Sequence, residues 1–101
     1  MVWADLSPQA GHEQDGRRPV VILTTETYNT KAGLALICPV TNQAKDYPFE
    51  VTIPPTCGTT GVALADQVKS LDWRARRFVY KGTVPESVLD AILRAVRGLI
   101  G

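Results

Sequence analysis

Long hydrophobic runs are missing from this sequence, and their absence argues against two classes of protein. No uninterrupted apolar stretch approaches the roughly 18 residues that a membrane-spanning helix needs. Asp5 interrupts the first apolar stretch, where a secretory signal keeps a continuous apolar core. We therefore expect a cytoplasmic protein that does not cross a membrane.

Metal-binding side chains are also scarce. The chain has one histidine and two cysteines, and its carboxylates form no cluster at ligand spacing. Cys38 lies inside an apolar run and Cys57 among proline, glycine and threonine, a pattern that fits neither a disulfide framework nor a zinc site. We expect two free thiols, no metal ion and no cofactor.

An excess of charge of one sign is absent as well. Charged residues make up 21% of the chain, and the formal net charge is +1. The overall balance therefore gives no sign of a surface for a polyanion, and any basic patch must be local.

The residues that are present suffice for one core. With 101 residues and 45% hydrophobic content, we expect a single domain over residues 1–101. The sequence begins abruptly at its first apolar run, so we expect part of the first strand to be missing at the N-terminus.

Six short segments have the apolar or alternating composition of β-strands. They are Val2–Leu6, Pro19–Thr25, Leu34–Val40, Phe49–Ile53, Gly61–Ala65 and Arg76–Tyr80. Between them we expect one helical turn at Glu26–Thr30, a turn at Pro54–Gly61 and a surface connection at Asp66–Ala75.

The end of the chain has a helical pattern. Thr83 and Glu86 have the spacing of a capping box. Apolar residues then recur at helical spacing, at Val88, Ile92, Ala95, Val96 and Leu99. Short strands followed by one helix predict a mostly β (α+β) fold, a small curled antiparallel barrel with the helix packed on it.

Ser7–Arg17 has loop composition and is longer than a hairpin needs, which is typical of functional loops. Together with Arg18, this loop contains a base, acids and guanidinium groups within seven positions. Its polar residues there are His12, Glu13, Gln14, Asp15, Arg17 and Arg18. A base beside an arginine suits phosphodiester cleavage, because a hydroxyl loses its proton while charge grows on the phosphoryl oxygens. A solvated loop is the alternative. Arg18 is the stronger candidate of the two arginines, because it precedes Pro19 at the entry to a buried strand.

Two further clusters could bind phosphate. The first follows the Leu34–Val40 run and consists of Thr41, Asn42, Gln43 and Lys45, although turns often have this composition. The second consists of Asp66, Gln67, Lys69, Trp73, Arg74, Arg76 and Arg77. Basic side chains beside an indole suit single-stranded nucleic acid, whereas a buried tryptophan flanked by solvated arginines is the alternative. If the chain cleaves phosphodiesters without a metal, RNA is the natural substrate, because its 2′-hydroxyl is a built-in nucleophile.

At these clusters the sequence resembles the MazF/PemK family of toxin endoribonucleases from bacterial toxin-antitoxin pairs, and it is closer to the MazF branch. Four blocks carry the resemblance over nearly the whole chain, GHEQDGRRPVVIL (Gly11–Leu23), CPVTNQAKDYPFEV (Cys38–Val51), GVALADQVKSLDWRAR (Gly61–Arg76) and KGTVPE (Lys81–Glu86). The family usually has about ten more residues before the first strand.

The resemblance implies an SH3-like, CcdB/MazF-like antiparallel β-barrel that forms a homodimer. It also implies metal-independent, sequence-specific cleavage of single-stranded RNA. The 2′-hydroxyl attacks, and the products are a 2′,3′-cyclic phosphate and a 5′-hydroxyl. The implied protein partner is a MazE-like antitoxin whose disordered tail blocks the RNA groove.

The resemblance also implies roles for single residues. The catalytic arginine and threonine of the family fall on Arg18 and Thr41, and Glu13 contributes in the MazF branch. The RNA groove falls on Lys45, Asp66, Gln67 and Lys69, and we expect further RNA contacts from Gln14, Trp73, Arg74 and Arg76. In the PemK branch, a histidine, an arginine and an aspartate form the acid-base set. His12 and Asp66 match two of these, but Leu64 occupies the arginine position.

Two other functions stay open at this point. Related CcdB proteins share the barrel and bind DNA gyrase through the end of the C-terminal helix, but Leu99 and Ile100 show no special signature there. An inactive RNA-binding module is supported only by the basic segment Lys69–Lys81.

Overall fold

The computed structural model describes residues 1–6 and 17–101. Its strands are β1 (Val2–Asp5), β2 (Arg17–Ile22), β3 (Leu34–Thr41), β4 (Glu50–Ile53), β5 (Gly61–Leu64), β6 (Lys69–Asp72) and β7 (Val79–Tyr80). Its helices are α1 (Glu26–Ala32) and α2 (Glu86–Ile100), with single 3-10 turns η1 (Pro55–Cys57) and η2 (Ala65–Gln67). Among the helices of the described ranges, none is long and apolar enough to span a membrane.

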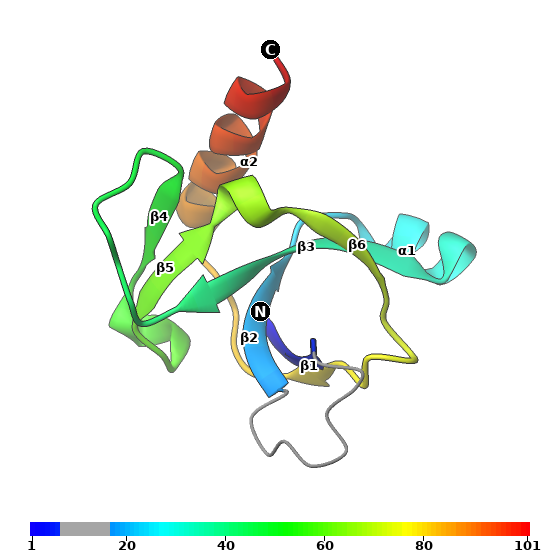
Figure 1. Cartoon of the computed structure of the whole chain (residues 1–101). Coiled ribbons are helices and arrows are strands. Elements are labelled where there is room, and N and C mark those ends of the chain that lie inside the picture. The colour runs from blue at the N-terminus through cyan, green and yellow to red at the C-terminus, as the bar shows by residue number, and fades with distance from the viewer. Residues whose placement is uncertain (7–16) are drawn as a thin grey trace.

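The strands form one antiparallel sheet that is organised around β3 (Figure 1). The strand order is β4-β5-β3-β2-β1-β7, and β6 pairs with the first half of β3. β3 thus pairs with β2 along one edge and with β6 and then β5 along the other. The predicted mostly β fold with a C-terminal helix is confirmed, but the sheet is curled and open rather than a closed barrel.

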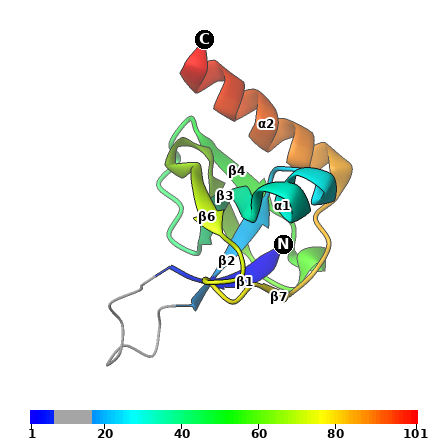
Figure 2. The same cartoon turned by 90° about the vertical axis from the view of Figure 1, so that its right-hand side faces the viewer.

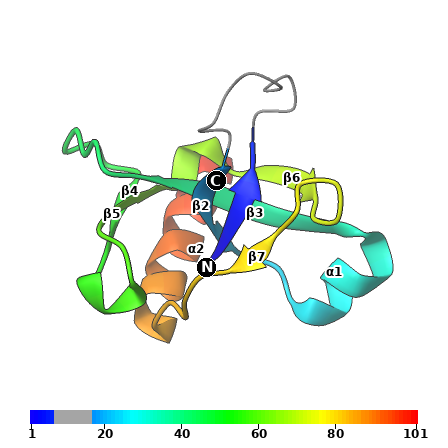
Figure 3. The same ribbon diagram turned by 90° about the horizontal axis from the view of Figure 1, so that it is seen from below.

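The core lies on both faces of this sheet, because β3 is buried on both sides over much of its length. One cluster includes Cys38 and Val40 and is covered by α2, whose Ile92 is fully buried. The other cluster includes Ala35 and Ile37 and fills the inside of the curl. Figure 2 shows α2 lying across one side of the sheet, and Figure 3 shows β3 running from α1 toward the β4 end.

The segment predicted to be a surface connection contains a strand that its sequence does not predict. β6 (Lys69–Asp72) pairs with Leu34–Ile37 of β3. Only Leu71 of these four residues is buried, so the short segment has too little apolar alternation to be recognised as a strand. The strand predicted at Arg76–Tyr80 shrinks to Val79–Tyr80, because a turn with Arg77 at φ 56 precedes it.

Both helices begin or end differently from the prediction. α1 extends to Ala32 rather than one turn, because Thr25 caps its first turn and Gly33, at φ 72, ends it. α2 begins at Glu86 with Pro85 as its N-cap, so the capping box predicted at Thr83 is wrong. The Thr83 hydroxyl instead shares a 2.7 Å hydrogen bond with that of Tyr80.

Candidate functional site

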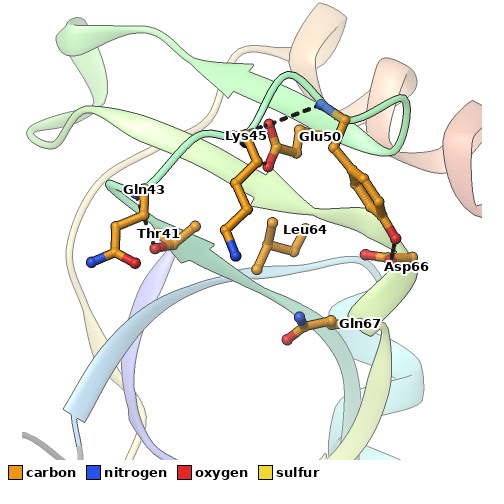
Figure 4. A pocket seen from close by; sticks show the side chains of 8 residues that line it. Thr41, Gln43, Lys45, Glu50, Leu64, Asp66 and Gln67 are labelled. Atoms are coloured by element: carbon orange, nitrogen blue, oxygen red, sulfur yellow. Dashed lines mark hydrogen bonds between the residues drawn. The ribbon is translucent and has the colours of Figure 1, made fainter.

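A pocket of about 370 Å³ lies where β3 ends beside β5 and η2 (Figure 4). Its lining residues are Thr41, Gln43, Lys45, Tyr47, Glu50, Leu64, Asp66 and Gln67. Three of the residues predicted to line the RNA groove and one predicted catalytic residue are therefore brought together. In Figure 4 the amino group of Lys45 lies between the side chains of Thr41 and Leu64.

Thr41 is held at the floor of this pocket by the sheet. It is the last residue of β3 and pairs with Val62 of β5. Its Oγ1 accepts a 3.2 Å hydrogen bond from the backbone N–H of Gln43, so its own proton remains available to a ligand oxygen. The side chain is only half-buried. A hydroxyl that is fixed by backbone pairing and open to solvent suits a phosphoryl oxygen.

Arg18 is the second residue of strand β2, which begins two residues earlier than predicted, and its side chain is exposed. β2 and β3 pair in the register Val20 to Pro39 and Ile22 to Ile37. Arg18 lies two residues before Val20, and Thr41 lies two residues after Pro39, so each points to the same face as its strand neighbour in that pair. Residues opposite one another in an antiparallel pair point to the same face. Arg18 does not line the pocket, but it shares the sheet face of Thr41.

Lys69 belongs to the same face. It is the first residue of β6 and pairs with Ile37, which shares its sheet face with Thr41 because the two are an even number of residues apart in β3. Its side chain is exposed. The register thus gathers the cations of Arg18 and Lys69 on one face, close in the fold to the pocket that Lys45 lines.

Two pocket residues were not identified from the sequence. Glu50 is the first residue of β4, and its carboxylate accepts 3.0 Å hydrogen bonds at both oxygens from the backbone N–H of Lys45. The Tyr47 hydroxyl donates a 2.6 Å hydrogen bond to Asp66 Oδ2. This hydrogen bond to Asp66 and the negative charge of that carboxylate raise the pKa of the Tyr47 hydroxyl. The alternation of Phe49–Ile53 puts Glu50 on the opposite side from its apolar residues, as on a solvent-facing strand position, so only the structure reveals its role.

The predicted RNA contacts beyond β6 lie away from the pocket. Trp73 is half-buried, and its Nε1 donates a 2.7 Å hydrogen bond to the Asn29 carbonyl. The Arg74 guanidinium lies 4.7 Å from the centre of the Trp73 ring, a cation-π contact. Arg76 Nη1 donates to the Asp5 carbonyl at 3.2 Å. Trp73 and Arg76 therefore have structural contacts, while Arg74 is exposed.

The remaining predicted site residues, Glu13 and Gln14, lie outside the described residues, as does His12. Their roles stay predictions. Cys38 and Cys57 are buried free thiols, and burial raises the pKa of the Cys38 thiol to about 12. A thiol with so high a pKa is a poor nucleophile at neutral pH.

Comparisons with known proteins agree with this fold. Residues 1–100 match the family described as the PemK-like, MazF-like toxin of type II toxin-antitoxin system. The endoribonuclease toxin MazF of Escherichia coli K12 is 48% identical over 101 residues, which cover 100% of this chain and 90% of the relative. The endoribonuclease PemK of Escherichia coli is 37% identical over 97 residues, covering 91% of this chain and 73% of the relative.

Solved structures of MazF proteins are similar to this chain as well. A crystal structure of MazF from Deinococcus radiodurans superposes with a TM-score of 0.89 at 49% identity, covering 99% of this chain and 91% of that one. A MazE-MazF crystal structure from the same organism superposes with a TM-score of 0.90 at 46% identity and the same coverage. The chain therefore belongs to the PemK-like, MazF-like family of toxins of type II toxin-antitoxin systems.

Proposed function

We propose that this chain is a toxin endoribonuclease that cleaves single-stranded RNA, sequence-specifically and without a metal ion. The observation that carries the proposal is the placement of Arg18 and Thr41 on one sheet face, next to a pocket lined by Lys45 and Gln67. A guanidinium, a hydroxyl and an ammonium group bind phosphate oxygens. The family membership and the names of the relatives point to the same activity.

In the proposed reaction the RNA supplies its own nucleophile. The 2′-oxygen forms a bond to phosphorus, and the bond from phosphorus to the 5′-oxygen breaks. The proton of the 2′-hydroxyl passes to a base, and the leaving 5′-oxygen takes up a proton, so the products are a 2′,3′-cyclic phosphate and a 5′-hydroxyl. No redox step or bound metal is required by this balance.

Each catalytic candidate has a distinct role in this scheme. Arg18 stabilises the negative charge that grows on the phosphoryl oxygens, and Thr41 donates a hydrogen bond to one of them. Arginine is a poor proton donor, so charge stabilisation is its principal role. Glu13, from the sequence-based assignment, orients or deprotonates the 2′-hydroxyl.

The RNA path extends from the pocket along the sheet face. Lys45, Gln67 and Lys69 offer donors to phosphates and base edges, and Asp66 offers an acceptor. Arg74, which is exposed and stacked on Trp73, continues the basic segment for a longer strand. Gln14 and Arg76 complete the proposed contacts.

The proposed partners follow from the family. Relatives have been solved as MazE-MazF complexes, and we propose that a MazE-like antitoxin inhibits this chain by covering its RNA-binding face. We also propose a homodimer. The substrate is messenger RNA, so we place the activity in the cytoplasm.

A single cleavage experiment tests the proposal. The purified chain is incubated with a transcript in the presence of a chelator, and the ends of the fragments are mapped. We expect cuts at a recurrent sequence, with cyclic phosphate and 5′-hydroxyl ends. A transcript with 2′-deoxyribose at the cut position should stay intact, and its cleavage would contradict the cyclising mechanism. RNA binding without cyclic phosphate would favour an inactive RNA-binding module instead.

A further inference from the structure

The loop at residues 42–49, which connects β3 to β4, carries Gln43 and Lys45 into the pocket. Its residues 42–48 are all exposed, so packing contributes little to its conformation. A solvent-exposed loop of this kind has many accessible conformations unless hydrogen bonds fix it. The contacts that hold this loop therefore decide where Lys45 and Gln43 lie.

Glu50 makes the first of these contacts. Both of its carboxylate oxygens lie 3.0 Å from the backbone nitrogen of Lys45, and Oε1 also lies 3.5 Å from that of Tyr47. The backbone N–H of Glu50 in turn donates to the Tyr47 carbonyl at 3.0 Å. One carboxylate, half-buried at the start of β4, thus folds the loop back on itself.

Tyr47, which also lines the pocket, makes the second contact. Its hydroxyl donates to Asp66 Oδ2 at 2.6 Å, and its ring meets that of Phe49 edge-on, with 6.2 Å between centroids. The loop is therefore tied at its base to β4 and at Tyr47 to η2. The backbone N–H of Lys45 makes the first tie, and Tyr47, two residues later in the sequence, makes the second, so Lys45 is constrained by both.

We propose that Glu50 is a positioning residue, which fixes the loop at residues 42–49 so that Lys45 and Gln43 meet RNA bound at Thr41. The inference rests on the proposed ribonuclease function and deepens it. Glu50 itself touches no phosphate in this scheme, because a carboxylate would repel one. It acts by accepting the N–H of Lys45, and Tyr47 assists it by holding the other end of the loop.

The substitution Glu50→Gln tests this with little change of size. Its carboxamide keeps one acceptor oxygen for the Lys45 N–H, but it presents an NH₂ group in place of the second acceptor and lacks the negative charge that strengthens both bonds. Because the loop then loses part of its preorganisation before RNA binds, we expect KM to rise by about five- to tenfold with kcat within about twofold. Tyr47→Phe, which keeps the ring and removes the hydroxyl, should raise KM by a smaller factor.

Two control variants are matched to these changes. Asp90→Asn removes the same charge from an exposed position of α2, and Tyr28→Phe removes a hydroxyl from a tyrosine that is as exposed as Tyr47, at 43% against 45%. Both should keep the wild-type KM and kcat. Equal effects in test and control variants would overturn the inference.

Amide hydrogen exchange supplies a readout that does not depend on activity. In Glu50→Gln the amide of Lys45 should exchange about tenfold faster or more, while core amides such as that of Cys38 keep their protection. General loss of protection would indicate a merely structural role and overturn the inference, as would a fall in kcat with unchanged KM.

Failure of the wild-type chain to cleave RNA would contradict the proposed function and, with it, the role of Glu50 in RNA binding. Wild-type cleavage with an unchanged KM in Glu50→Gln would overturn the inference alone.

Discussion

The hydroxyl of Tyr47 donates a 2.6 Å hydrogen bond to Asp66 Oδ2 and so joins two segments that lie 19 residues apart in the sequence. Tyr47 belongs to the loop between β3 and β4, and Asp66 belongs to η2. Both segments line the pocket at Thr41. A substitution of either residue therefore removes a link between two parts of the pocket lining.

This hydrogen bond makes the titration of Tyr47 a probe of the pocket. Tyr47 has its pKa raised above the ordinary value of 10.0, first by the hydrogen bond to Asp66 and then by the negative charge of that group. The bond favours the neutral phenol, so the stability it contributes is present below pH 10.0 and is lost as pH rises through the higher folded-state pKa. We expect Asp66→Asn to bring the pKa back toward its ordinary value.

Tyrosinate absorbance measures this directly, in a Tyr28→Phe and Tyr80→Phe background that leaves Tyr47 as the only tyrosine. Asp72→Asn, an exposed change on β6, is the control and should leave the titration unchanged. An Asp66→Asn titration identical to that of the parent would contradict the contact.

The Thr41 hydroxyl should matter for the chemical step. Thr41→Val keeps the shape of the side chain but removes the donor to the phosphoryl oxygen, so we expect kcat to fall by about 10²-fold. Thr41→Ser should retain most of the activity. The matched control is Thr52→Val on β4, since Thr52 pairs with Val62 on the same row of the sheet but does not line the pocket. Equal kcat values for Thr41→Val and Thr52→Val would contradict a catalytic role for Thr41.

The sequence allowed the strands around β3 and the helix α2 to be predicted, because their apolar periodicity is strong. Ile92 was placed correctly in the core by its spacing alone. β6 was missed because only Leu71 of its residues is buried. Its strand conformation depends on pairing with β3, which is a tertiary effect that local composition does not encode.

The candidate site could be predicted only in part, for a similar reason. Thr41 and Lys45 stand out as a polar cluster after an apolar strand. The roles of Glu50 and Tyr47 depend on hydrogen bonds to the loop backbone and to a distant carboxylate. The placement of Arg18 on the same sheet face as Thr41 depends on the register of β2 and β3, which no motif states.

Arg18 should be required for its charge and for its planar shape. Arg18→Ala should lower kcat by about 10³-fold or more, and Arg18→Lys should restore only part of it, because an ammonium cannot make paired hydrogen bonds to a phosphate. Arg17→Ala is the control, since Arg17 lies on the other face of β2, 5.9 Å from the ring centre of Trp3. Cleavage of an oligonucleotide in chelator measures all three. Persistent growth inhibition by Arg18→Ala in cells would favour a toxin that does not cleave RNA.

The packing of α2 gives a prediction about stability. Ile92 is fully buried between α2 and the sheet, whereas Ile100 at the end of the same helix is 82% exposed. Ile92→Ala removes the same atoms as Ile100→Ala but leaves a cavity, so it should lower the free energy of unfolding by about 2–5 kcal/mol. Ile100→Ala should change it by less than about 0.5 kcal/mol in the monomer. Denaturant titration distinguishes the two.

Gly61 links the stability of the sheet to the position of Thr41. It begins β5 at φ +129, and a Cβ there would overlap the Thr41 carbonyl oxygen. Neither the backbone conformation nor the contact can be relieved by a side-chain rotation, so Gly61→Ala should lower the free energy of unfolding by about 2–4 kcal/mol. Because the strain falls on Thr41 itself, kcat should fall in the fraction that remains folded.

Gly98→Ala is the matched control for this change. Gly98 lies inside α2 with open space around the position of a Cβ, so alanine there should be neutral or should stabilise the chain by about 0.5–1 kcal/mol. Thermal unfolding and RNA cleavage, measured on both variants at a temperature where Gly61→Ala is still folded, separate the two effects. A stable Gly61→Ala variant with wild-type kcat would mean that β5 does not fix Thr41 in the way described.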